Sequence, residues 1–271
     1  MLSEPGLTLR TMRENLEIQP VPAFRDNYIW LLRRGLHAVV VDPGDALPLL
    51  PLIDSIGLKL EAILVTHHHA DHVGGVVQLA TRYGAPVYGP AAESITGVSA
   101  PLSGGETISL PGIGAAFEVW SVPGHTRGHL AFVGRDGDVA GVVFCGDTLF
   151  GAGCGRLFEC TPEQMFESLS RLAALPDETQ FYCAHEYTAA NLRFAHLIEP
   201  DNVDIMRRIK DVAVQGALGR PTVPFSLAEE KATNPFLRSH QPAVRDAAVA
   251  RGAAPDPGSV FAEIRAWRNQ L

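Results

Sequence analysis

The chain has 271 residues, of which 46% are hydrophobic and 19% are charged, the balance of a globular protein with a sizeable core. Its formal net charge of −8 argues against nucleic acid as a partner. Residues 1–185 hold 11 basic and 20 acidic side chains, whereas residues 186–271 hold 11 and 10, so the C-terminal part repels an anionic ligand least.

The cysteines and the N-terminal residues both favour a cytoplasmic location. None of the four cysteines forms a CxxC pair, and a chain of this length needs no disulfides for stability, so we expect reduced thiols in a cytoplasmic protein. The N-terminal residues contain an early acid and no apolar segment typical of a signal peptide. No apolar run approaches the ~18 residues that a membrane span needs, so no membrane association is expected.

Short β-like runs alternate with helix-like runs over the first two-thirds of the chain. Strands are predicted at residues 28–32, 37–44, 61–66, 117–125, 129–134, within 136–148 and at 181–186. Helices are predicted at residues 73–84, with Gly84 just past the end, and at 161–175. Thr161 can cap the second helix, Pro162 occupies its first position, and Gln164 completes a capping box.

The pattern changes near residue 186. Helices are predicted at residues 188–200, 203–219 and 226–235, and no strand-like run follows Cys183. Ser226 and Glu229 form a second capping box, and Pro235 ends that segment. We therefore expect two domains, residues 1–185 and residues 186–271.

The stretch THHHADHVGG, residues 66–75, concentrates ligand-capable side chains at the end of a predicted strand. His67 and His69 are two residues apart, so in extended backbone they point the same way and can bind one ion, whereas His68 points away. Asp71 and His72 follow where the chain turns into a helix and can reach a second position beside the first. Imidazole and carboxylate ligands suit zinc, manganese or iron.

Three further candidates stand at the ends of later predicted strands: His125 in PGHTRGH, Asp147 in CGDT and His185 in CAHE. Seven such groups suffice for two three-ligand sites that share one bridging carboxylate, for which Asp147 is the candidate. A solvated histidine loop would explain the tract but not the repeated strand-end pattern. His129 is expected to contact a metal ligand and orient it, without binding the metal itself. Three other histidines are expected to be ordinary hydrogen-bonded residues: His37, His196 and His240.

These motifs together resemble the metal signature of the metallo-β-lactamase superfamily, carried by THHHADHVGG, PGHTRGH, GDTLF and CAHEY. Three segments narrow the resemblance to the glyoxalase II family, the hydroxyacylglutathione hydrolases: VPAFRDNYIW, GAGCGR and RPTVPFSLAEEKATNPFLR. The resemblance covers nearly the whole chain. It implies an α/β fold, an αββα metallo-β-lactamase sandwich over residues 1–185 that carries the catalytic site, followed by an all-helical substrate-binding domain over residues 186–271.

The resemblance also implies a metal assignment and a reaction. It divides the ligands into two sets bridged by Asp147 and a hydroxide: His67, His69 and His125 for one ion, and Asp71, His72 and His185 for the other. The family converts S-D-lactoylglutathione into D-lactate and glutathione, a step of methylglyoxal detoxification. The hydroxide, held by Asp71, Asp147 and the histidines, attacks the thioester carbonyl, and a thiol of pKa ~8.5 leaves without a protein acid. Two divalent ions are expected, zinc first, with iron or manganese as alternatives.

The glutathione site implied by the resemblance is lined by Arg156, Phe158, Tyr187, Arg265 and Arg268. Some family members have lysine at the first and last of these positions, and arginine keeps that charge. Phenylalanine at position 158 replaces a tyrosine and loses its hydroxyl. Arg265 and Arg268 would share one helix face and could meet one carboxylate, and a solvated helix face is the alternative for this pair.

Other functions fit the same motifs less well. An iron-dependent persulfide dioxygenase resembles this family but uses a mononuclear iron, so about two ions per chain would favour the hydrolase. A catalytically silent metal-binding module would lack part of one ligand set. A β-lactamase is disfavoured by the helical C-terminal part and by the N-terminal residues. We expect a monomer that acts on a small glutathione thioester.

Overall fold

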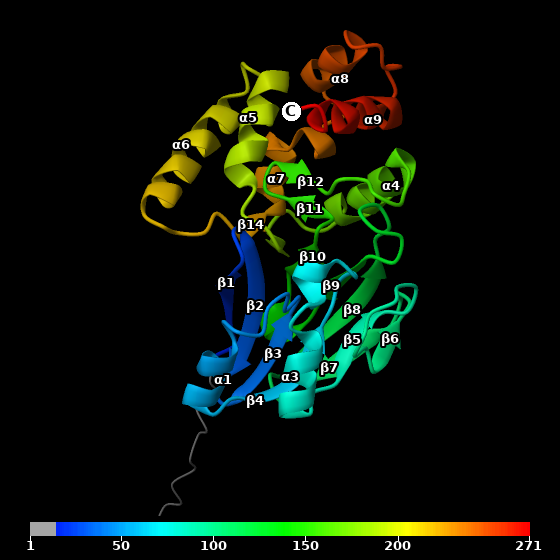
Figure 1. The fold of residues 1–271 in the computed structure, drawn as a ribbon. Coiled ribbons are helices and arrows are strands. Elements are labelled where there is room, and N and C mark those ends of the chain that lie inside the picture. The colour runs from blue at the N-terminus through cyan, green and yellow to red at the C-terminus, as the bar shows by residue number, and fades with distance from the viewer. Residues whose placement is uncertain (1–14) are drawn as a thin grey trace, which may run out of the picture.

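Two six-stranded sheets form the body of the protein, which the computed structural model describes over residues 15–271 (Figure 1). The first sheet runs in the order β1 (Glu17–Ala23), β2 (Asn27–Arg34), β3 (His37–Val41), β4 (Lys59–Leu64), β5 (Val87–Pro90) and β6 (Ala100–Leu102). The second runs in the order β14 (Phe225–Ser226), β13 (Gln180–Cys183), β10 (Val142–Gly146), β9 (Leu130–Gly134), β8 (Ala115–Ser121) and β7 (Thr107–Leu110). A small hairpin joins β11 (Leu149–Phe150) to β12 (Gly153–Cys154).

Helices cover the sheets and one end of the sandwich. Those of the first two-thirds are α1 (Leu50–Ile56), α2 (Ala70–Val73), α3 (Val76–Tyr83) and α4 (Pro162–Ala173). Those of the C-terminal part are α5 (Thr188–Ile198), α6 (Val203–Ala217), α7 (Leu227–Thr233), α8 (Pro242–Val249) and α9 (Pro257–Arg268). Short 3₁₀ turns lie at η1 (Gly137–Val139) and η2 (Pro235–Leu237).

Alternating side chains along the central strands explain why the two sheets stack. Trp30 and Leu32 of β2 belong to the core that also contains the second sheet and α4, whereas Ile29 and Leu31 belong to the core beneath α1 and α3. Both faces of the first sheet are therefore buried. The predicted αββα sandwich followed by a helical C-terminal part is confirmed.

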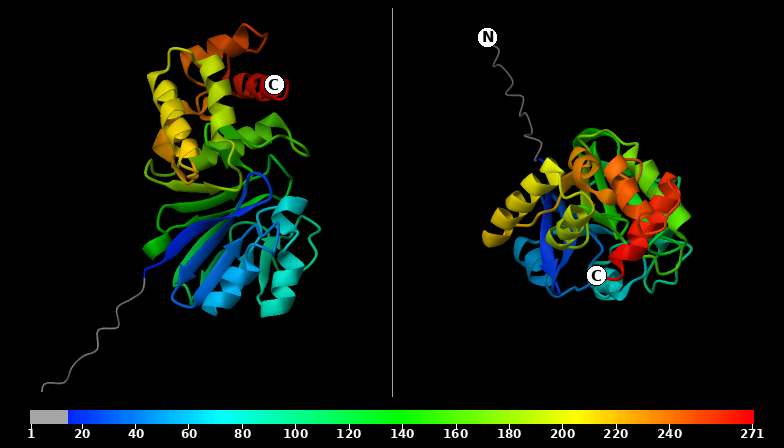
Figure 2. Two further views of the ribbon diagram at one scale, coloured as in Figure 1. Left: turned by 60° about the vertical axis from the view of Figure 1, so that its left-hand side comes forward. Right: turned by 90° about the horizontal axis from the view of Figure 1, so that it is seen from above.

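The C-terminal helices sit on one end of the sandwich, as the two views of Figure 2 show. Leu192 of α5 packs with Ile205 and Val212 of α6 in a small core of their own. The region is not purely helical, because β14 pairs antiparallel with β13 and extends the second sheet. The prediction that no strand follows Cys183 is therefore wrong, since a two-residue strand is too short to leave a periodic pattern.

Most predicted elements are present with shifted ends. The capping box of α4 is confirmed, because Thr161 accepts from the Gln164 N–H and the Gln164 side chain accepts from the Thr161 N–H. Ser226 caps α7 by accepting from the Glu229 N–H, but the Glu229 carboxylate lies beside an arginine of α6 instead of closing a box. The helix predicted at 73–84 is two helices, α2 and α3, and three predicted strands are shorter than expected: β3, β8 and β13.

Within residues 15–271, no helix is both long and apolar enough to cross a membrane. The prediction that the N-terminus lacks a signal peptide rests largely on residues 1–14, which lie outside the described part of the chain.

Candidate metal centre

The seven predicted ligands meet at one end of the sandwich, beneath the C-terminal helices. His67 and His69 follow β4, and Asp71 and His72 lie in α2, directly after them. The other three follow strands of the second sheet: His125 after β8, Asp147 after β10 and His185 after β13. Strand ends of both sheets thus supply the site. The backbone of Asp71 packs closely against Gly44, and only glycine fits there, because a Cβ on residue 44 would lie 1.8 Å from the Asp71 carbonyl oxygen.

Three groups of three side chains have donor atoms within 4.8 Å of one another. Two of them share no residue and form a first and a second ligand set, and the third, His67, His72 and Asp147, takes one histidine from each set together with Asp147. In the first set, His69 Nδ1 lies 3.1 Å from His67 Nε2 and 2.9 Å from His125 Nε2. The second set consists of Asp71, His72 and His185. These are the two sets implied by the family resemblance.

Asp147 lies between the two sets and faces both. Its Oδ1 is 3.4 Å from His72 Nε2 and 3.3 Å from His185 Nε2, whereas its Oδ2 is 3.4 Å from His125 Nε2. The residue is only 6% exposed. A carboxylate with one oxygen toward each set has the geometry of a bridge between two ions.

Carboxylates behind the second set orient its histidines. Asp42 Oδ2 is 3.0 Å from His72 Nδ1, and Asp26 Oδ1 is 3.0 Å from His185 Nδ1. A proton on each Nδ1 leaves each Nε2 with a free lone pair, the form that binds a metal.

The first set is oriented by oxygens of the protein in the same way. The carbonyl oxygen of Arg156 is 2.8 Å from His125 Nδ1, and the hydroxyl of Thr66 is 3.1 Å from His67 Nδ1. His69 differs, since its Nδ1 faces the other donors.

Sequence reasoning did not single out these orienting residues. Asp42 follows an apolar strand just as the ligands do, so its position was a usable signal. Asp26 and its neighbour Asn27, whose amide donates to Asp71 Oδ2 over 3.0 Å, lie in the family-like segment VPAFRDNYIW. Their pairing with residues far along the chain is visible only in the fold.

Burial and neighbouring charges shift the pKa values of histidines in the two sets in opposite directions, as His67 and His72 show. Burial, helped by the surrounding histidines, holds the pKa of His67 well below its usual value. Burial also acts to lower the pKa of His72, but the carboxylates of Asp147, Asp42 and Asp71 outweigh it and raise that pKa to about 9. Burial alone would raise the pKa of Asp147, yet the nearby histidines keep it well below its usual range, so this carboxylate stays ionised.

Two buried atoms at the centre have no hydrogen-bond partner among residues 15–271: His72 Nε2 and Asp147 Oδ1. Unpaired buried polar atoms are costly, so their presence indicates that another group completes the site. Imidazole nitrogens and carboxylate oxygens at these separations fit divalent metal ions. The residues therefore fit the metals that the motifs predicted.

Two histidines of the motifs lie outside the ligand sets. His68 points away from the donors toward Glu93 and Glu159. His129 stacks on the ring of His67 at 4.6 Å, and its Nε2 accepts from the Asp147 N–H over 3.1 Å. His129 thus supports both a ligand ring and the backbone of the bridging residue.

A cavity of about 500 Å³ opens above the two sets, within the ~300–1,000 Å³ typical of small-molecule sites. Besides ligands, its lining includes Phe150, Arg156, Phe158 and Tyr187. The Phe158 ring is 60% exposed and meets the His69 ring edge-on at 5.5 Å. The Tyr187 ring stacks on His185 at 4.6 Å.

Neither Arg265 nor Arg268 lines this cavity. Arg265 is linked to the cavity residue Arg156 through Asn269, whose side-chain oxygen accepts from both Arg156 Nε and Arg265 Nη2. Arg265 is 6% exposed, and its Nη1 donates to the Cys154 carbonyl over 3.0 Å, which fixes α9 against β12. Its role in the fold was not predicted.

Four arginines form a cluster, and the first of them lines the cavity: Arg156, Arg193, Arg265 and Arg268. Burial, followed by the charges of the other three, lowers the pKa of Arg268. None of the four forms an ion pair with a carboxylate among the described residues. Arg193 was missed in the sequence, because an exposed arginine on α5 is indistinguishable there from a solvated one. The cluster is therefore a concentration of positive charge without carboxylate partners among residues 15–271.

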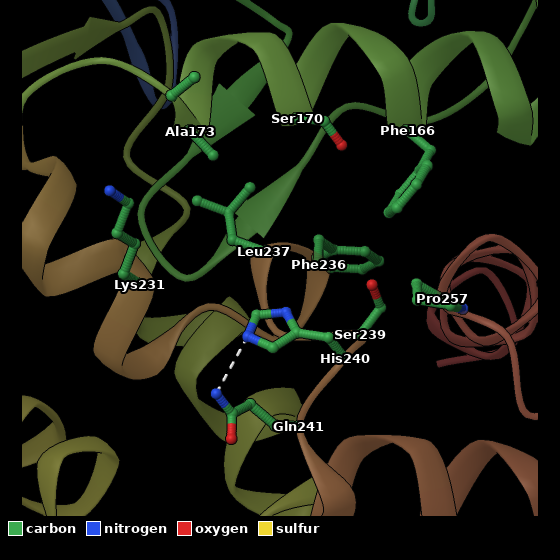
Figure 3. A pocket seen from close by; sticks show the side chains of 11 residues that line it. Phe166, Ser170, Ala173, Lys231, Phe236, Leu237, Ser239, His240, Gln241 and Pro257 are labelled. Carbon is green, nitrogen blue, oxygen red and sulfur yellow. Dashed lines mark hydrogen bonds between the residues drawn. The ribbon is translucent and has the colours of Figure 1, made fainter.

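A second cavity, of about 660 Å³, lies between α4 and the C-terminal helices (Figure 3). Phe166, Phe236 and Leu237 make its wall largely apolar, and His240 at its edge contacts the side chain of Gln241. None of the metal-binding groups found among residues 15–271 lies in it. The smaller cavity, in contrast, is lined by five of the predicted ligands: His69, Asp71, His125, Asp147 and His185.

The fold and the paired histidine–aspartate sets define a protein of the metallo-β-lactamase superfamily, whose family model matches residues 23–185. A second model, described as "Hydroxyacylglutathione hydrolase C-terminus", matches residues 186–271. The chain is 55% identical over 269 residues to the hydroxyacylglutathione hydrolase of Dechloromonas aromatica, an alignment that covers 94% of this chain and 99% of that one. It belongs to the hydroxyacylglutathione hydrolase family, as the motifs predicted.

Solved structures share the fold at lower identity. ETHE1 from Myxococcus xanthus superposes with a TM-score of 0.64 at 24% identity, over 94% of this chain and 91% of that one. The protein TTHA1623, solved in a di-iron-bound form, gives a TM-score of 0.57 at 29% identity, over 81% of this chain and 100% of that one.

Proposed function

We propose that this protein hydrolyses the thioester of S-D-lactoylglutathione and releases D-lactate and glutathione. The observation that carries the proposal is the pair of three-ligand sets joined by Asp147 at the base of a cavity lined by Arg156, one of four clustered arginines without a carboxylate partner among residues 15–271. The 55% identity to a hydroxyacylglutathione hydrolase supports the same reaction class. Hydrolysis of such a thioester needs a water-derived nucleophile and a surface that binds an anionic substrate. The ligand sets would supply the first and the arginines the second.

The proposed cofactors are two divalent metal ions. His67, His69 and His125 would hold one, Asp71, His72 and His185 the other, and Asp147 would contact both. Bound there, the ions would bring the pKa of a water toward ~7 and stabilise negative charge on the thioester oxygen. We propose zinc, which suits this donor set; iron and manganese also fit, and a relative of this fold was solved with two irons.

The chain's own groups have distinct tasks in the proposed reaction. Asp147 stays ionised and therefore serves as a ligand instead of donating a proton to the leaving group. The glutathione thiol, of pKa ~8.5, can leave as a thiolate without such a donor. Burial and nearby carboxylates raise the pKa of Tyr187, so its hydroxyl stays protonated and can donate a hydrogen bond to bound substrate.

Glutathione carries two carboxylates, which the arginine cluster would bind. Arg156 and Tyr187 contribute directly to the cavity wall, and Arg268 adds charge beside it. Arg265 would act partly by fixing α9, since its guanidinium already donates to the Cys154 carbonyl. Phe158 provides an aromatic wall over the first ligand set without the hydroxyl found in some relatives.

The test is turnover of S-D-lactoylglutathione by the purified protein, with metal content measured on the same sample. We expect release of D-lactate and free thiol, with about two ions per chain. A persulfide dioxygenase would instead consume oxygen with glutathione persulfide and hold one iron, and that result would replace the proposal. Bound metal without either reaction would indicate a silent binding module.

We further propose that the enzyme works as a monomer in the cytoplasm. Both ligand sets and the arginine cluster come from a single chain, so no second copy is needed to complete the site. All four cysteines are free, as expected for a reducing compartment. Light scattering of the purified protein and fractionation of cells test these two statements.

A further inference from the structure

The first ligand set depends on contact between loops of two different sheets. His67 and His69 follow β4 of the first sheet, whereas His125 lies in the β8–β9 connection of the second. One backbone hydrogen bond, from the Leu130 N–H to the Thr66 carbonyl, joins the loops at their base over 2.9 Å. His125 itself contacts the Arg156 carbonyl through Nδ1, and its own carbonyl accepts from the Phe158 N–H over 3.4 Å, so its position depends on these two contacts and on what holds the rest of its loop.

Carboxylates hold three consecutive residues of the β8–β9 connection. The Thr126 hydroxyl and the Gly128 N–H both donate to Glu93 Oε1, over 2.5 Å and 3.0 Å. The Arg127 N–H donates to Glu159 Oε2 over 2.9 Å. Thr126 is fully buried and the Glu93 side chain is 4% exposed, so water competes little for these bonds.

Glu93 belongs to the β5–β6 connection of the first sheet, so its carboxylate bridges the two sheets. The approach is close, because a Cβ on Gly128 would lie 2.6 Å from Glu93 Cγ. The other carboxylate oxygen lies 3.0 Å from His68 Nδ1, without the alignment of a hydrogen bond. The same side chain thus contacts the loop of His125 directly and the loop of His67 and His69 through His68.

We infer that Glu93 is a positioning residue, which holds the β8–β9 connection so that His125 Nε2 stays beside the donor atoms of His67 and His69. The inference rests on the proposed assignment of these three histidines to one ion. Loss of the Glu93 carboxylate deletes none of the metal-binding side chains. It removes the hydrogen bonds that hold Thr126 and Gly128, and therefore loosens the loop that carries His125. Residues that orient ligands are worth ~10–100-fold in metal affinity, and Glu93 acts through neighbours of the ligand, so we expect about tenfold.

The test titrates metal-free protein with Zn²⁺ in competition with a chromophoric chelator, which resolves the two ions. His125→Ala and His185→Ala serve as references that remove one ligand from the first or the second set. We expect Glu93→Ala to weaken about tenfold the same ion that His125→Ala loses, and to leave the other ion unchanged. Glu93→Gln should bind both ions normally, because its amide oxygen can still accept from Thr126 and Gly128.

Two further variants test the route of the effect. Thr126→Val removes one donor at nearly constant volume and should show part of the loss, with no added loss in combination with Glu93→Ala. His68→Ala removes the unaligned contact with Glu93 and the contact with Glu159, but no bond to the β8–β9 connection, and should retain both ions.

Metal-free thermal unfolding separates positioning from folding. The inference is overturned if Glu93→Ala binds both ions normally, if it weakens both equally in proportion to a lowered Tm, or if Glu93→Gln is as impaired as Glu93→Ala. If His125→Ala itself retains both ions, the metal assignment under the proposed function fails first.

Discussion

Arg268 offers a direct test of how an anionic substrate is held. It lies in the last turn of α9, half-buried, with its guanidinium carbon 5.7 Å from the centre of the Phe194 ring. It clusters with Arg193, Arg265 and the cavity residue Arg156, and none of the four has a carboxylate partner among residues 15–271. Arg268→Gln removes one charge and keeps a polar side chain of similar reach.

The size of the effect follows from the surroundings of the guanidinium. A carboxylate ~4 Å away gains ~1 kcal/mol at the dielectric constant of water and ~4 kcal/mol at an effective value of ~20. Because Arg268 is half-buried beside an exposed Arg156, we expect a value near the lower limit, about 1–1.5 kcal/mol. That corresponds to a rise in KM of about 5–12-fold. kcat should not change, because the contact is remote from the thioester and equal in ground and transition states.

The assay measures hydrolysis of S-D-lactoylglutathione at physiological salt and at about 1 M salt, where the Debye length falls to ~3 Å and the difference in KM should shrink. A small uncharged thioester should be hydrolysed equally by both proteins. Arg245→Gln is the matched control, since it removes the same charge from the C-terminal helices at a residue already paired with Asp246. An unchanged KM, or an equal loss on the uncharged thioester, would refute the reasoning.

Three other outcomes follow from the geometry of the centre and its neighbours. Asp147→Ala should lower metal content and turnover by orders of magnitude, because this carboxylate faces both sets, and retention of two ions at a near-normal rate would contradict its bridging role. His72 must lose a proton before its Nε2 can bind a metal ion. Because the pKa of His72 is raised to about 9, the metal affinity of the second set should fall about tenfold for each pH unit below 9. The first set, whose His67 pKa is low, should change little between pH 7 and pH 9, and Zn²⁺ competition at several pH values measures both trends. Ala152→Gly should change the free energy of urea unfolding by less than about 1 kcal/mol, because relief of the backbone at φ 54° is offset by loss of a fully buried methyl group.

The metal ligands were predictable because they share a local pattern that survives without the fold. His125, Asp147 and His185 each follow an apolar strand and a small residue, and strand ends of one sandwich meet at a common edge. Their orienting partners have no such pattern. The contact between Asp26 and His185 joins residues on different sheets, so only the packing of the sheets brings the two together.

The predicted glutathione residues show the limit of arguing from spacing. Arg265 and Arg268 do share a helix, as expected, but they differ in burial, because the first packs against β12 and the second lies over the Phe194 ring of α5. A three-residue spacing places two side chains on neighbouring parts of a helix surface but does not say what packs there. Arg193 lies on another helix, so no spacing argument along α9 could include it.

The acidic character of residues 1–185 has a different meaning once the site is assembled. Taken alone, the excess of 20 acidic over 11 basic groups suggests that this half repels an anionic thioester. Several of those carboxylates lie in or directly behind the ligand sets, at Asp26, Asp42, Asp71 and Asp147. Two divalent ions would offset them with four positive charges, so the base of the cavity would attract the thioester oxygen instead of repelling it. Under the proposed function, the arginine cluster, drawn mainly from residues 186–271, would bind the distant carboxylates of glutathione, and the charge difference between the two parts of the chain would follow from this division of tasks.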